Sequence, residues 1–81
     1  MKLVHKLVGY DRNTEFVGAE FNVPDQTFDL VRSIAGVNSQ KDPNAMGNYP
    51  LSRPVAEEIA KIIGASIDTK QYDFFLEPEG A

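Results

Sequence analysis

The residues of this chain that could do chemistry are few, and they stand apart from one another. The single histidine, His5, lies in a predicted strand with no carboxylate or second histidine nearby in sequence, which favours a surface or sheet-face role over catalysis. Glu57 and Glu58 are neighbours in a predicted helix, where adjacent side chains point about 100° apart, so they are interpreted as a solvated face and not as an acid–base pair. There is no cysteine, which excludes disulfides and thiol chemistry. We therefore expect no catalytic residue and predict that the protein is not an enzyme.

Metal and cofactor sites are also not predicted. Asp42 and Asn44 place oxygen ligands two residues apart, but their segment lacks the spaced acidic positions and the terminal glutamate of a calcium loop. The six glycines occur singly, so no glycine-rich loop opens a helix to hold a phosphate. We expect neither a metal nor a cofactor.

Composition narrows the classes of partner. The 81 residues carry 8 basic and 12 acidic side chains, a net charge of −4, and the basic ones are scattered. Nucleic acids and anionic membranes require clustered lysine and arginine, so both are disfavoured, whereas a basic protein partner is compatible with the charge. No apolar run approaches the ~20 residues that span a bilayer, and Lys2, His5 and Lys6 interrupt the N-terminus, which does not resemble a signal peptide. We expect one cytoplasmic domain over residues 1–81.

The best-defined element is a helix over residues 51–64, LSRPVAEEIAKIIG. Ser52 can cap its first turn, Pro54 is tolerated there because its missing N–H has no partner, and Gly64 can end the helix. Arg53 is an alternative cap, since a residue before proline avoids the α region. The apolar side chains share one side of this helix: Leu51, Val55, Ala56, Ile59, Ala60, Ile62 and Ile63.

A second helix is predicted within residues 25–36, with Asp25 as its cap and Gly36 as its stop. Residues 37–50 then form a polar connection, longer than the usual ~4–6 residues, that is either functional or mobile. Met46 and Tyr49 are its only large apolar groups and would pin it to the core. In the helix predicted within residues 25–36, the apolar side consists of Phe28, Leu30, Val31, Ile34 and Ala35.

Three stretches read as strands. Residues 2–10 and 15–23 flank a turn cluster at 11–14 and predict a hairpin, and a third strand over 71–77 ends at Pro78. Alternation in the second strand assigns Val17, Ala19, Phe21 and Val23 to the core face. The first strand stays ambiguous because a one-residue slip exchanges its faces: either Leu3, Leu7 and Gly9, or Val4, Val8 and Tyr10, join the core.

The element order ββααβ predicts an α+β fold. The simplest arrangement is a small three-stranded, mostly antiparallel sheet with two helices packed on one face. The sequence does not identify the central strand, and a parallel pairing of the second and third strands remains an alternative.

Two short motifs carry a family resemblance. Tyr49-Pro50-Leu51-Ser52 and the closing stretch of residues 72–77, Tyr-Asp-Phe-Phe-Leu-Glu, resemble a family of small bacterial proteins catalogued only as a domain of unknown function. The resemblance spans most of the chain and includes the GYDRNTE turn. It implies the ββααβ order and a bacterial intracellular source, and it supplies no catalytic residue or cofactor.

The leading functional hypothesis is a non-catalytic protein-interaction module. Two helices cover only one side of a sheet, so we expect apolar strand residues, Phe16 and Phe75 among them, to remain on the outer side for self-association or docking of a partner. A sharper version is an immunity- or inhibitor-type protein that neutralises a basic partner. The alternative is a small ligand-binding protein or enzyme with a pocket under the 37–50 loop, where Asp42, Asn44 and Tyr49 would be the polar groups.

Overall fold

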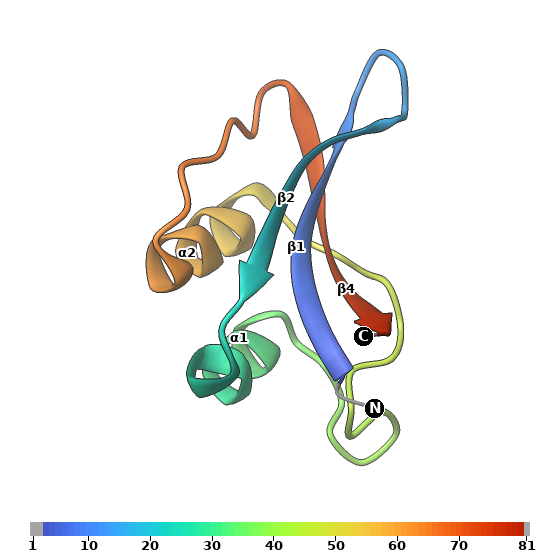
Figure 1. Cartoon of the computed structure of the whole chain (residues 1–81), viewed down its shortest axis with the longest axis vertical. Helices are drawn as coiled ribbons and strands as arrows, with labels where there is room; N and C mark the ends of the chain where they lie inside the picture. The colour runs from blue at the N-terminus through green and yellow to red at the C-terminus, as the bar shows by residue number, and fades with distance from the viewer. Residues whose placement is uncertain (1–2, 81) are drawn as a thin grey trace.

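The computed structural model describes residues 3–80 and has the α+β fold, with two α-helices and a four-stranded sheet (Figure 1). The strand order is β2-β1-β4-β3, and each neighbouring pair is antiparallel. The elements in chain order are β1 (Leu3–Asp11), β2 (Val17–Val23), the 3-10 turn η1 (Asp25–Thr27), α1 (Phe28–Ile34), β3 (Tyr49–Pro50), α2 (Arg53–Ile63) and β4 (Tyr72–Gly80).

The expected three-stranded sheet is wrong by one strand. The end of the long connection pairs with β4 as β3, with Tyr49 opposite Leu76 and Pro50 opposite Phe75. A two-residue strand that contains proline has no alternation to detect, and proline, which has no N–H to donate to a neighbouring strand, is favoured at a sheet edge, which is where β3 lies. The parallel alternative is also wrong, because β1 lies between β2 and β4 and pairs antiparallel with both.

The register settles which face of β1 joins the core. Leu7 lies opposite Phe21 on β2 and Leu76 on β4 and is fully buried, so the Leu7 and Gly9 set faces the helices. The side chain of Leu3 lies outside the described part of the chain. Val4, Val8 and Tyr10 belong to the opposite side, which we call the outer face; it also carries Lys6 of β1 and Asp73, Phe75, Glu77 and Glu79 of β4.

A β-bulge interrupts the core face of β2. The register shifts between Gly9, which pairs with Ala19, and Tyr10, which pairs with Val17. Gly18 is thus the extra residue, and the expected core position Val17 is 49% exposed. The bulge makes room for an aromatic ring: a Cβ built on Gly18 would lie 2.4 Å from Cε1 of Tyr72, which is too close for any side chain.

Helix α2 confirms its predicted signals. Ser52 is the cap, accepting a 3.4 Å hydrogen bond from the backbone N–H of Val55, and Gly64 ends the helix at φ 75°. Arg53 is the first helical residue and not the cap. Neither α-helix among residues 3–80 is long and apolar enough to cross a membrane.

Helix α1 is shorter than expected. Asp25 opens the 3-10 turn and does not cap α1. Leu30, predicted to face the core, is 54% exposed, whereas Val31 is fully buried. Residues three and six or seven positions apart share one side of so short a helix, which places Phe28, Val31 and Ile34 toward the core and turns Leu30 away.

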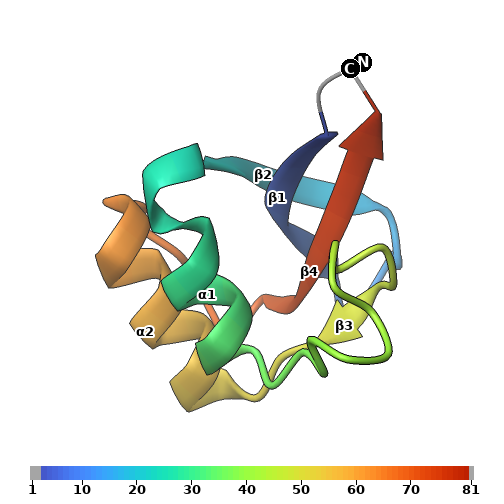
Figure 2. The same ribbon diagram turned by 90° about the horizontal axis from the view of Figure 1, so that it is seen from below.

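Both helices lie on the same side of the sheet (Figure 2). The sheet and both helices contribute side chains to one buried cluster. Its members are aliphatic except for Phe74. The buried cluster consists of Leu7, Val23, Val31, Ala56, Ile59, Ala60, Phe74 and Leu76.

Candidate functional site

The polar residues of the 37–50 loop bond within the loop. The carboxylate of Asp42 accepts hydrogen bonds from the backbone N–H of Met46 at 2.8 Å and of Gly47 at 3.0 Å, and from the phenol of Tyr49. The bond from Tyr49 and the two N–H bonds hold the pKa of Asp42 below its usual value, and the same bond raises the pKa of Tyr49. Asp42 is therefore the centre of a folded loop.

His5 ties this loop to the sheet. Its Nε2 lies 3.1 Å from the carbonyl oxygen of Asn44 and 3.0 Å from that of Ala45. Carbonyls only accept, so Nε2 carries the proton and donates to both. His5 is 5% exposed and its ring lies 4.4 Å from that of Phe28, centroid to centroid, so of the two expected roles the sheet-face one is correct and the surface one is wrong.

Charged side chains cover one end of the outer face. The ammonium of Lys6 lies 2.5 Å from Glu79 and 3.9 Å from Glu20, and the bond to Glu79 raises the pKa of Lys6. Beneath them Val8 is only 4% exposed. The outer face is thus not the broad apolar surface that strand alternation suggested.

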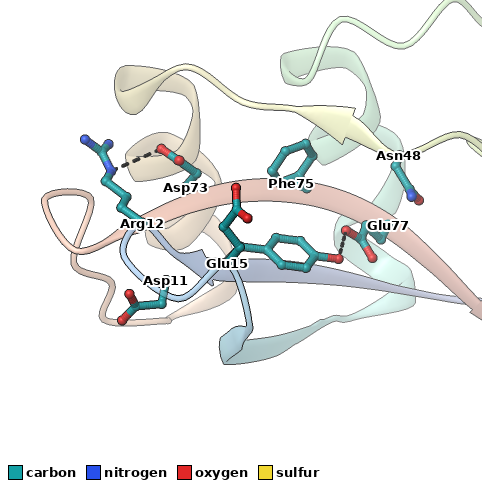
Figure 3. Close-up of a pocket in the computed structure, with 8 residues that line it drawn as sticks. Asp11, Arg12, Glu15, Asn48, Asp73, Phe75 and Glu77 are labelled. Carbon is teal, nitrogen blue, oxygen red and sulfur yellow. Dashed lines mark hydrogen bonds and ion pairs between the residues drawn. The ribbon is translucent and has the colours of Figure 1, made fainter.

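The other end of the outer face is hollowed into a groove of about 350 Å³, next to the β1–β2 turn (Figure 3). Its aromatic part is Phe75, half-buried, whose ring meets that of Tyr10 edge to face at 5.3 Å and 89°. The phenol of Tyr10 donates a 2.6 Å hydrogen bond to Oε2 of Glu77, which raises the pKa of Tyr10. The groove is lined by Tyr10, Asp11, Arg12, Glu15, Asn48, Asp73, Phe75 and Glu77.

The groove has more negative than positive side chains, and some of its carboxylates already have partners within the fold. Four carboxylates and one guanidinium line it, a net charge of −3. Asp73 is paired with Nε of Arg12 at 3.1 Å. Asp11 accepts from the N–H groups of Asn13 and Thr14 and from Gln71, in that order of importance, and these bonds lower its pKa. The Asp11 carboxylate thus stabilises the β1–β2 turn.

Glu15 is the carboxylate of the groove that has no hydrogen-bond or ion-pair partner among residues 3–80. Its backbone adopts φ 64°, a left-handed conformation in which glycine or asparagine is usual. The turn is closed around it, since the N–H of Glu15 donates to the carbonyl of Asp11 at 2.7 Å. The hairpin therefore holds a free carboxylate at the rim of the groove.

The structure divides the predicted site residues into three groups. Phe75 lines the groove. Phe16 is 77% exposed at the end of the hairpin, beside Glu15 in sequence but outside the lining. Asp42, Asn44 and Tyr49 lie together in the loop that Asp42 organises, and the loop gives the groove only Asn48. No cluster of three or more potential metal ligands occurs among the described residues.

Sequence reasoning missed Tyr10 and Glu77. In the sequence, Tyr10 belongs to a strand whose faces stay ambiguous and Glu77 ends the motif of residues 72–77, but their contact joins residues 67 positions apart. The signal lies only in the β1–β4 register, which sets Tyr10 across from Asp73, Val8 across from Phe75 and Lys6 across from Glu77. The Tyr10 side chain contacts the Phe75 ring and its phenol bonds to Glu77.

Comparison with known proteins identifies the family of the chain. The model of a family described as a domain of unknown function (DUF7683) matches residues 5–77. No curated protein and no solved structure matches the chain.

Proposed function

Since the chain belongs to this family, whose description gives no activity, we propose from its geometry that it is a non-catalytic interaction module that docks a protein partner through the groove end of the outer face. The observation that carries the proposal is the groove itself: an aromatic pair, Tyr10 and Phe75, framed by carboxylates on the sheet face that the helices do not cover. Half-buried aromatic side chains within a polar rim are the usual composition of a docking site.

The charge supports a basic partner. The groove carries −3 and the chain −4, so a cationic surface would be attracted toward this face and an anionic one repelled. An inhibitor or immunity-type role against a basic protein is the sharper form of this proposal. The excess of carboxylates in the groove is the observation that supports it.

The residues predicted for a ligand pocket under the 37–50 loop do not supply comparable support. Asp42 and Tyr49 bond to each other, and Asn44 contributes its backbone carbonyl to His5. The Asp42 carboxylate and the Tyr49 phenol are thus engaged within the fold, which favours the sheet as the functional surface.

The experiment compares two variants that each add one carboxylate to an apolar surface position. Phe75→Asp alters the groove, and Leu30→Asp alters α1, where the side chain is 54% exposed. Light scattering first decides whether the wild-type chain is a monomer. Immobilised wild type and variants are then used to capture partners from the cells that express the chain.

We expect a captured basic protein, or a self-associated dimer, to be retained by Leu30→Asp and lost with Phe75→Asp, while circular dichroism shows unchanged helix content. Retention by both variants would contradict the proposal. If Phe75→Asp loses helix content, the milder Phe75→Ser takes its place in the same comparison.

A further inference from the structure

We infer that the groove receives one arginine side chain from the partner, its guanidinium lying against the Phe75–Tyr10 pair and bonding to Glu77 and Glu15. This inference rests on the proposed function and names the chemistry that the groove recognises.

The aromatic part of the groove suits a flat cation. Tyr10 and Phe75 meet edge to face, so their contact uses the face of only one of the two rings. Both side chains line the groove, where the other ring face is left for a ligand (Figure 3). Ring faces attract cations through their quadrupole, and a guanidinium both stacks on a ring and donates in its own plane. An ammonium has no plane and matches this surface less well.

Two carboxylates of the lining supply hydrogen-bond acceptors. The phenol of Tyr10 engages Oε2 of Glu77, which fixes the orientation of that carboxylate while Oε1 keeps its capacity to accept. Glu15 has no partner among residues 3–80, and the closed turn presents it at the same groove. Two acceptors beside an aromatic pair match the donors of one guanidinium.

The groove already holds this kind of contact at one end. The guanidinium of Arg12 lies with Nε 3.1 Å from Asp73 and donates from Nη2 to the carbonyl of Thr69 at 2.8 Å. That pairing uses Asp73 and leaves three charges of the lining without a cation, those of Asp11, Glu15 and Glu77 (Figure 3). Asp11 is engaged by neutral donors of the turn, so Glu15 and Glu77 are the carboxylates that can pair with an incoming cation. An incoming arginine would repeat the same pairing with them.

Other occupants fit less well. An anionic group would meet a lining of −3, and an apolar side chain would desolvate the two carboxylates without pairing them. A bare metal ion would require a cluster of ligands that the described residues do not form.

The test is a titration of the ¹⁵N-labelled chain with three blocked tripeptides, Gly-Arg-Gly, Gly-Lys-Gly and Gly-citrulline-Gly, followed by NMR. Citrulline keeps the shape of arginine and removes its charge. We expect the arginine peptide to shift the amide signals of Tyr10, Phe75 and Glu77, with binding at least about tenfold tighter than the citrulline peptide and several-fold tighter than the lysine peptide.

Variants locate the contact. Glu15→Gln and Glu77→Gln each keep side-chain shape and an acceptor oxygen, and each should weaken binding of the arginine peptide about tenfold, because the carboxylate charge that strengthens its hydrogen bond to the guanidinium is removed. Glu58→Gln, on the exposed back of α2, should leave binding unchanged. The same spectra report whether each variant is folded.

Equal binding of the arginine and citrulline peptides, or of the arginine and lysine peptides, would overturn the inference. So would arginine binding that Glu15→Gln and Glu77→Gln leave intact. If no peptide binds while the Phe75-dependent partner is still captured, the inference fails and the proposed function stands; if capture is also independent of Phe75, both fail.

Discussion

The ring of Tyr72 occupies the space that a side chain at position 18 would need, and Gly18 is the extra residue of the bulge in β2. A Cβ on Gly18 would come within 2.4 Å of Cε1 of Tyr72, and one on Gly9 within 2.8 Å of Phe74. The two glycines thus seat two aromatic rings against the sheet.

We predict that Gly18→Ala destabilises the fold by about 1–3 kcal/mol, the usual cost of forcing atoms into a filled site. Urea denaturation measures the change. In a Tyr72→Leu background the obstructing ring is absent, so the same substitution should cost much less, and an equal cost in both backgrounds would show that the ring is not the reason.

The buried and exposed leucines give a second prediction. Leu76 is fully buried at the centre of the sheet, so Leu76→Ala should lower the free energy of unfolding by about 2–5 kcal/mol. Leu30, at 54% exposure on α1, is the matched control, and Leu30→Ala should change it by no more than about 0.5 kcal/mol. A large effect at Leu30 would mean that α1 is rotated relative to the arrangement described above.

The bond between Tyr10 and Glu77 predicts a pH dependence. Because this bond raises the pKa of the phenol above its usual 10.0, the stabilisation it gives is complete below pH 10 and is lost as pH rises through the folded-state pKa. We expect the NMR signal of the Tyr10 ring to titrate above pH 10 and to move to lower pH in Glu77→Gln. The Tyr49 signal, whose partner is Asp42, should not respond to Glu77→Gln.

Asp42 predicts the opposite dependence at acid pH. Its pKa is lowered in the folded state, so its stabilising effect is complete above the unfolded pKa of about 3.9 and is lost as pH falls through the folded-state pKa. The melting temperature of Asp42→Asn should therefore lie below that of wild type at pH 7, and the gap should narrow below about pH 4. Glu58→Gln should show no such gap at either pH, and a gap for Asp42→Asn that stays constant with pH would contradict the assignment.

Sequence by itself determined the elements whose signals are local. The cap at Ser52, the stop at Gly64 and the apolar side of α2 lie within one stretch, and the structure confirms them. The hairpin and the existence of the closing strand were likewise predicted, because alternation and turn residues act between near neighbours. The predicted end at Pro78 is wrong, since β4 continues through Pro78 to Gly80 and pairs there with β1.

Only the tertiary structure decided the rest. The pairing of β1 with β4, the short strand β3 and the hydrogen bonds from His5 to carbonyls 39 and 40 residues away all join distant segments. The groove depends on the same register, since Tyr10 and Glu77 meet only when β4 lies beside β1 in that alignment. Local preference fixes which stretches are strands, but a shift of one residue in register exchanges every side chain between the two faces, so the site exists only once the sheet has formed.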